Sequence, residues 1–164
     1  MAEQQIPSFT LPHVAGGADV SSSEYSGRTF VLAFAGRSSG DQAEKISDTL
    51  RAKYTVEALP VVQIANLKGV PGFVKGLAKK DITKAYQKES QKEAARLQAQ
   101  GKLVPDDLSH SVVMLLDWDG AVAGGLGLSD IDKTAVALLV DGDGKVCGTG
   151  TGAQGGEQIL SMLG

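Results

Sequence analysis

Short apolar runs alternate with amphipathic stretches along the chain, a pattern that predicts strands alternating with helices. The most apolar runs are typical of strands buried on both faces, and they cover 29–34 (TFVLAF), 59–64 (LPVVQI), 111–116 (SVVMLL) and 135–140 (AVALLV). The turn sequence DGDG after the last run predicts a β-hairpin whose second strand covers 145–149. A first strand is expected at 6–11, where Pro7 and Pro12 would keep it at a sheet edge.

Helices are predicted from the stretches between these strands. Within 41–53, apolar residues recur at helical spacing and give the segment one apolar face. The segment 70–100 is also predicted to be helical, with a break near Gly76 or Lys80. Weaker helices are expected at 121–128, which is rich in glycine, and at 156–163, which closes the chain.

This order of elements indicates an α/β fold, with a mixed central sheet and flanking helices. Right-handed crossovers would place the first helix and the closing helix on the same face of the sheet. The chain has 164 residues, of which 42% are apolar and 21% charged, as expected for one soluble globular domain over 1–164.

Charge and hydropathy exclude several classes of partner. A net charge of -3 gives no general attraction to nucleic acid or to a membrane. No run of about 18 apolar residues is present, so no membrane span is predicted. The N-terminal segment MAEQQIPSFTLP lacks the basic and apolar regions of a signal peptide, which predicts a cytoplasmic protein as written. The alternative is a periplasmic protein whose leader has been removed.

The only cysteine is Cys147, which excludes an intramolecular disulfide and any metal site built on a pair of cysteines. We expect Cys147 to be a buried small hydrophobic residue, the alternative being a reactive thiol. DGDG lacks the acidic residue that would close a calcium-binding loop. We therefore expect no metal and no cofactor.

The turn between the first buried strand and the first helix, FAGRSSGDQ, is the first candidate site. Ser39 and Gln42 have the spacing of a helix-capping box. The alternative is a small-anion site formed by Arg37, Ser38 and Ser39 at the helix N-terminus, although the negative charge of Asp41 opposes it.

Two further readings of this turn depend on partners elsewhere in the chain. A serine nucleophile would need a base, and the histidines, His13 and His110, have no recognisable triad context. The guanidinium of Arg37 is expected to pair with a carboxylate of Asp130 or Asp132.

A basic stripe on the 70–100 helix is the second candidate site. Its members are four residues apart and therefore share a helix face: Lys80, Lys84, Lys88, Lys92 and Arg96. The stripe is either a solvated helix face or a docking surface for an acidic partner, a lipid headgroup layer or a nucleic acid. Phe73 and Tyr86 are the only aromatic residues near it, which argues against stacking on single-stranded nucleic acid. Trp118, in the turn DWDG, is a further candidate contact residue.

Several stretches resemble the thioredoxin fold, and in particular its peroxiredoxin and TlpA-like branch. They are IPSFTLP, TFVLAFAGRSSGDQ, LLDWDGAVAGGLGL and AVALLVDGDGKV. The resemblance implies a three-layer sandwich with a helical insertion at about 70–100. It also implies that the redox site would lie at the turn Arg37, Ser38, Ser39, Gly40, Asp41 and Gln42. Ser39 and Gln42 stand where an enzyme of this fold has Cys-x-x-Cys, and 129–136 lacks the usual cis-proline.

A closer resemblance rests on the motif AGRSS (35–39) together with KTAVALLVDGDGKV. These residues are similar to the YtfJ family, bacterial thioredoxin-like proteins that are typically periplasmic and have no established reaction.

These observations favour a non-catalytic protein. The first hypothesis is a redox-inactive binding or accessory protein that meets a protein partner through the turn and the basic stripe. The second is a thiol redox protein that acts through Cys147. The third is an enzyme of another class that uses Ser38 or Ser39.

Overall fold

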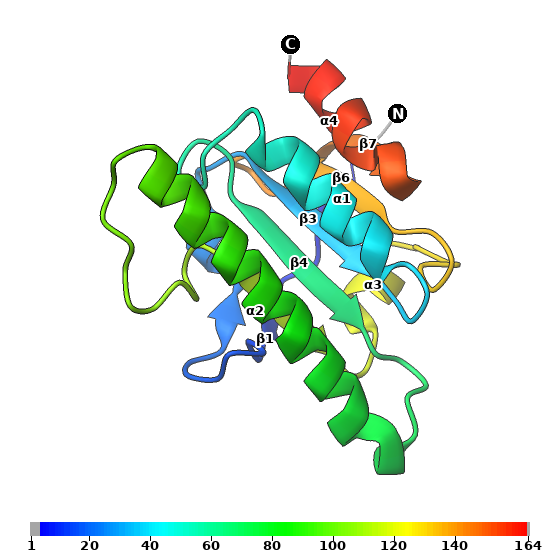
Figure 1. The fold of residues 1–164 in the computed structure, drawn as a ribbon. Helices are drawn as coiled ribbons and strands as arrows, with labels where there is room; N and C mark the ends of the chain where they lie inside the picture. The colour runs from blue at the N-terminus through cyan, green and yellow to red at the C-terminus, as the bar shows by residue number, and fades with distance from the viewer. Residues whose placement is uncertain (1–3, 164) are drawn as a thin grey trace.

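The computed structural model describes residues 4–163, and a five-stranded sheet runs through its centre (Figure 1). In the order β5-β4-β3-β6-β7, its strands are β5 (Val113–Asp117), β4 (Val61–Asn66), β3 (Phe30–Ala35), β6 (Val136–Val140) and β7 (Val146–Thr151). β3, β4 and β5 are parallel to one another, whereas β6 is antiparallel to β3 and to β7. The predicted mixed sheet is therefore confirmed, and each of its strands overlaps the predicted run.

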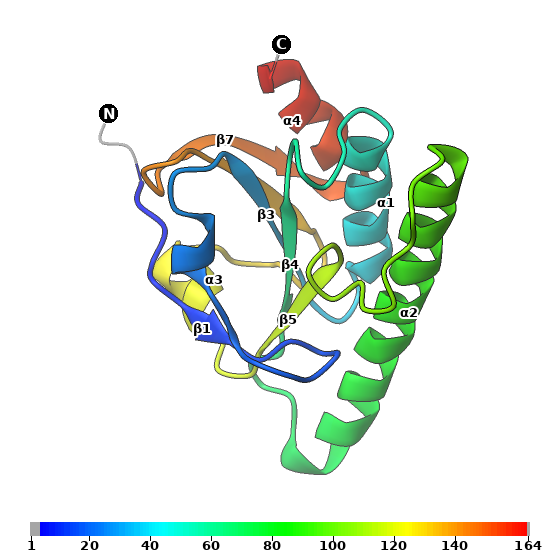
Figure 2. The same ribbon diagram turned by 90° about the vertical axis from the view of Figure 1, so that its left-hand side faces the viewer.

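Helices cover both faces of the sheet (Figure 2). One face carries α1 (Gly40–Arg51), α2 (Lys75–Ala99) and α4 (Gly155–Leu163), and the other carries α3 (Ala121–Gly125) and the N-terminal segment. The shorter elements are β1 (Thr10–Leu11), β2 (Val20–Ser21) and the 3-10 turns η1 (Ser22–Tyr25), η2 (Gly72–Val74) and η3 (Gly152–Gln154). The first and the closing helix share a face, as the right-handed crossovers predicted.

Two predicted element boundaries were wrong. The expected break near Gly76 or Lys80 does not occur, because α2 is continuous from Lys75 to Ala99. Gly76 lies in the first turn, where most backbone N–H groups have no intrahelical partner and a glycine disrupts little. The strand expected at 6–11 is reduced to β1, which pairs only with β2.

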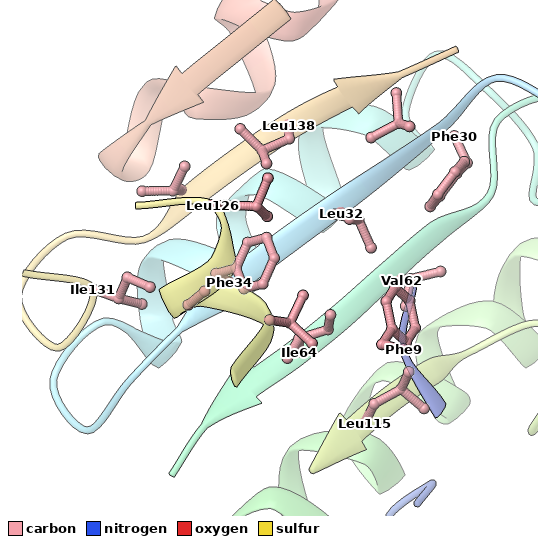
Figure 3. Packing of buried hydrophobic residues seen from close by; sticks show 14 of the residues in the cluster. Phe9, Phe30, Leu32, Phe34, Val62, Ile64, Leu115, Leu126, Ile131 and Leu138 are labelled. Atoms are coloured by element: carbon pink, nitrogen blue, oxygen red, sulfur yellow. The ribbon is translucent and has the colours of Figure 1, made fainter. Parts of the chain in front are cut away.

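The core has a large-residue side and a small-residue side, because β3 alternates between them. Phe30, Leu32 and Phe34 point toward α3 and the N-terminal segment, where they pack with residues of β4, β5 and β6 (Figure 3). Val31 and Ala33 point toward α1 and α4. The small side chains on the face that carries α1, α2 and α4 leave more room beneath these helices. The large side chains on the face that carries α3 leave less.

Candidate functional site

The turn from β3 to α1 is closed by hydrogen bonds from Ser39. This side chain is fully buried at the N-cap position of α1, yet it makes no capping hydrogen bond. Its hydroxyl accepts the N–H of Gly36 at 2.9 Å and donates to the carbonyl of Ile131. The predicted capping box is therefore wrong. The backbone of Ser39, at φ -116° and ψ 9°, lacks the extended conformation of a capping residue, and its hydroxyl is engaged instead by Gly36 of the turn and Ile131 of the loop before β6.

Gln42 holds the same loop with its side-chain amide. Its Nε2 donates to the carbonyl of Lys133 at 3.1 Å, and its Oε1 accepts the N–H of Ala135 at 2.8 Å. The two residues at the expected cysteine positions thus both join the turn to residues 131–135. We call this set of hydrogen bonds, between Gly36–Gln42 and 131–135, the clasp.

Asp132 completes the clasp through the backbone of the turn. Its carbonyl accepts the N–H of Ser38 at 3.0 Å, and its Oδ1 accepts the N–H of Arg37 at 3.2 Å. A Cβ on Gly36 would overlap Oδ1 of Asp132, so this close approach requires a glycine. The turn and the loop are therefore in direct backbone contact.

The side chain of Arg37 is left out of the clasp. The predicted ion pair with Asp130 or Asp132 is wrong, since Asp132 bonds to the backbone of Arg37 rather than to its guanidinium. Within residues 4–163, the exposed guanidinium makes no hydrogen bond and no ion pair, and it lies at the edge of a cavity described below. Ser38 is exposed as well. Both side chains remain predicted contact residues.

A serine-nucleophile arrangement is not supported by the geometry of the described residues. The Ser39 hydroxyl donates to a carbonyl and not to a base. His13 is buried, its Nδ1 accepts the N–H of Ala15 at 3.0 Å, and its Nε2 lies 3.0 Å from the carbonyls of Ser109 and Val112. The imidazole of His13 is thus engaged by backbone groups, which is a structural role.

Much of the basic stripe joins α2 to α1. Lys88 contacts Glu44 at 2.7 Å, and Lys92 and Arg96 contact Asp48 at 2.9 and 3.4 Å. The hydrogen bond from Lys88 is the main reason why the pKa of Glu44 is lowered below its usual value. These three cations form an interface between helices, which corrects their assignment to a docking face.

Lys80 and Lys84 are the part of the stripe that stays outside these pairs. Both side chains are exposed, and neither forms an ion pair with a described residue. The predicted docking surface is thereby reduced to these two lysines.

Two glutamates are buried beneath the stripe, which the sequence did not predict. Glu89 and Glu93 are 5% and 7% exposed, and they contact Lys92 and Arg96 at 3.4 and 3.3 Å. Burial raises the pKa of Glu89, while the charge of Lys92 opposes the shift. Burial likewise lowers the pKa of Arg51 on α1, against the opposing charge of Glu93. The C-terminal half of α2 therefore packs against α1 through charged side chains.

Cys147 is exposed, so the expectation of a buried side chain was wrong. It lies on β7, an edge strand whose side chains alternate between two faces. The face toward α4 belongs to Gly148 and Gly150, since a Cβ on either would meet atoms of Met162 or Gly155. The thiol of Cys147 donates weakly to the carbonyl of Leu139 at 3.4 Å, and β7 is separated from β3 by β6.

A cavity of about 550 Å³ lies between the first half of α2 and the sheet, beside the turn. Most of its exposed wall is apolar, and the side chains that form it include Ala65, Val70, Leu77, Ala78, Ile82 and Met114. Gly36, Arg37 and Gly40 place the turn at one side of the cavity. No feature of the sequence analysis indicated this cavity.

The cavity arises from alanines that face one another. Ala33 and Ala35 of β3 and Ala65 of β4 line the cavity from the face of the sheet that α2 covers. Ala78 and Ala85 line it from α2. Short side chains on both walls cannot meet, so the space between them stays unfilled. The alternation in FVLAFA and the seven-residue spacing of the two helical alanines are the sequence signals that could have indicated it.

Solved structures decide the fold. The chain has a thioredoxin-like fold. It superposes on a putative thiol:disulfide interchange protein DsbE from Chlorobium tepidum with a TM-score of 0.59 and 20% identity, covering 100% of this chain and 99% of that one. The pneumococcal exposed lipoprotein thioredoxin Etrx1 from Streptococcus pneumoniae matches with a TM-score of 0.60 and 18% identity, over 96% and 98% of the two chains.

A third match is the thioredoxin domain of a thiol-disulfide oxidoreductase from Bacteroides vulgatus, with a TM-score of 0.61 and 14% identity over 99% of this chain and 96% of that one. No protein-family model matches the sequence, and no curated protein is detectably similar to it. In the part of this thioredoxin-like chain that the structure describes, no helix is both long and apolar enough to cross a bilayer.

Proposed function

We propose that this thioredoxin-like protein carries out no thiol-disulfide exchange at the turn and acts as a binding or accessory protein. The observation that supports the proposal is the clasp. Ser39 and Gln42 occupy the expected thiol positions, and their side chains are hydrogen-bonded to residues 131–135. A disulfide substrate would find no nucleophilic sulfur at this place.

Insulin reduction and peroxide consumption test this proposal directly. We expect neither activity from the wild type or from Cys147→Ser, in assays where a thioredoxin with Cys-x-x-Cys is active. Activity in the wild type that is lost in Cys147→Ser would overturn the proposal in favour of a thiol protein working through β7. The exposure of Cys147 is the observation that keeps this second function open to test.

A protein partner is proposed to meet the exposed groups near the turn and on α2. Arg37 and the pair Lys80 and Lys84 lack ion-pair partners among the described residues. In affinity capture, Arg37→Ala or a charge reversal at Lys84 should lose partners that the wild type retains. Lys53→Glu makes the same charge change as the reversal at Lys84, at an exposed site just after α1, and should keep them. Identical partner sets for all variants would contradict this surface.

The YtfJ-type assignment and the periplasmic compartment that it implies are also proposals. Their support is the motif AGRSS, which forms the observed turn from β3 into α1. Cell fractionation with an antibody against the native protein tests the compartment. Recovery with periplasmic markers supports the assignment, and recovery with cytoplasmic markers contradicts it.

A further inference from the structure

We propose that the cavity beside the turn binds one long-chain carboxylate, a fatty-acid-like amphiphile, with its chain between α2 and the sheet and its carboxylate at Arg37. The proposal deepens the binding role proposed above, because it rests on the protein acting by binding and names a ligand and a place for it. It needs no chemistry from the turn itself.

The cavity has the size of a ligand site rather than of a packing defect. Protein interiors contain few voids larger than a water molecule, whereas small-molecule sites measure roughly 300–1,000 Å³. At ~30 Å³ per non-hydrogen atom, which is the share of a water molecule in the liquid, the 550 Å³ would hold about 18 such atoms. That is the size of a hexadecanoate ion.

The walls favour an apolar chain. The aliphatic side chains of Val70, Leu77 and Ile82 come from the α2 side, and Ala65 and Met114 come from the strands. Water in such a space has few hydrogen-bond partners, so replacing it with methylene groups is favourable. Each methylene added within the cavity should tighten binding by about fourfold.

Arg37 gives the ligand its charged end. It is the cation among the described lining residues, its guanidinium is exposed, and no described carboxylate pairs with it. A carboxylate placed there would form a charge-assisted, bidentate contact. Asp81 is the acidic residue of the lining, and its charge would keep the carboxylate at the Arg37 end.

Two large apolar side chains are exposed near the start of α2, and one of them, Leu77, lines the cavity. Phe73 is 89% exposed and Leu77 is 64% exposed. Among the described residues, the other large apolar side chains that are exposed are those of Leu103 and Met162. Phe73 lies in η2 and Leu77 in the first turns of α2, so both sit where the chain enters the helix that covers the cavity. Exposed apolar side chains near an apolar cavity suit an apolar ligand.

Titration of the delipidated full chain with hexanoate, decanoate and hexadecanoate, below their micelle concentrations, tests the proposal. Calorimetry should show one site, with affinity that rises with chain length and levels off near hexadecanoate. Trp118, the only tryptophan, packs against the same buried cluster as the cavity residues Val70, Ala78 and Ile82 and should report binding by a change in emission. Decanol should bind more weakly than decanoate. Absence of binding, or affinity that keeps rising beyond octadecanoate, would overturn the proposal.

Variants locate the site. Ala78→Phe fills the cavity and should abolish binding, whereas Ala95→Phe, on an exposed position of the same helix, should leave it unchanged. Arg37→Gln should weaken decanoate by roughly three- to tenfold without affecting decanol, because only the carboxylate loses a charged partner. Asp81→Asn should strengthen decanoate binding by removing a like charge.

Circular dichroism of each variant separates loss of binding from loss of fold, and Arg37→Gln keeps the test decisive if Ala78→Phe does not fold. Wild-type affinity in a folded Ala78→Phe variant would overturn the proposal. So would a dimer that closes the cavity and excludes decanoate. Thiol activity in the insulin assay would contradict the proposed function alone, whereas a redox-inactive protein that binds no carboxylate would contradict this inference alone.

Discussion

Ser39 and Gln42 act as structural links between two distant segments. The hydroxyl of Ser39 is shared between the N–H of Gly36 and the carbonyl of Ile131, which is 92 positions away in the chain. The amide of Gln42 bonds to Lys133 and Ala135 in the same loop. A side chain whose donor and acceptor are both engaged inside the protein stabilises the fold and is not free for chemistry.

Ser39→Ala should destabilise the protein by about 1–3 kcal/mol, because the buried carbonyl of Ile131 and the partly buried N–H of Gly36 would lose their partner. Urea unfolding of the two proteins measures the difference. The matched variant is Ser38→Ala, whose exposed side chain should change the free energy of unfolding by less than about 0.5 kcal/mol. Equal effects of both variants would contradict the role assigned to the clasp.

At the scale of elements, α2 meets its neighbours differently in its two halves. The C-terminal half joins α1 through ion pairs of Lys88, Lys92 and Arg96. Glu89 and Glu93 are buried in the same half of the helix. The N-terminal half forms one wall of the apolar cavity. The four-residue spacing of the basic stripe correctly placed Lys88, Lys92 and Arg96 on one face. It did not indicate which element that face would meet.

Glu89 should make the stability of the protein depend on pH. Burial raises its folded-state pKa above the usual value of 4.5, so below that pH the carboxyl is protonated in both folded and unfolded states. As the pH rises through 4.5 toward the folded pKa, the unfolded chain loses its proton first and the wild type loses stability. Glu89→Gln has no such group and should lose less over this interval.

Urea unfolding of the wild type and of Glu89→Gln, from below pH 4.5 to neutral pH, measures this difference. A wild type that instead gains stability relative to the variant with rising pH would show that the ion pair of Glu89 with Lys92 outweighs the cost of burial.

At the scale of the whole molecule, a thioredoxin-like sheet has a full core on one face and a partly unfilled one on the other. Phe30, Leu32 and Phe34 fill the side of α3. Ala33 and Ala35 leave the space under α2. An unfilled apolar space costs stability, which a bound apolar ligand would restore by binding the folded state alone.

Ala78→Leu should raise the stability of the ligand-free protein by about 0.5–2 kcal/mol, since it fills part of the cavity. Differential scanning calorimetry on delipidated protein measures the shift in melting temperature. Ala95→Leu adds the same atoms at an exposed position of α2 and should leave the melting temperature nearly unchanged. A lower stability for Ala78→Leu would mean that the two walls of the cavity approach each other in solution.

The sequence by itself determined the order of strands and helices, the mixed sheet, the hairpin at DGDG and the absence of cysteines from the turn. These features depend on local hydrophobic periodicity and on residue identity, which a sequence contains directly. The start of α2 and the length of β1 were predicted less well. The effect of a proline or of a glycine in a first helical turn depends on which backbone hydrogen bonds form around it, and the sequence does not show these.

The tertiary structure decided where the side chains of the candidate site point. Ser39 was expected to cap its own helix, but its hydroxyl accepts the N–H of Gly36 and donates to the carbonyl of Ile131 in the loop before β6. Lys92 was expected on a docking face, but α1 lies against it. The cavity is lined by alanines of the sheet and of α2, elements far apart in the chain. Such contacts join residues far apart in the chain, and only folding brings them together.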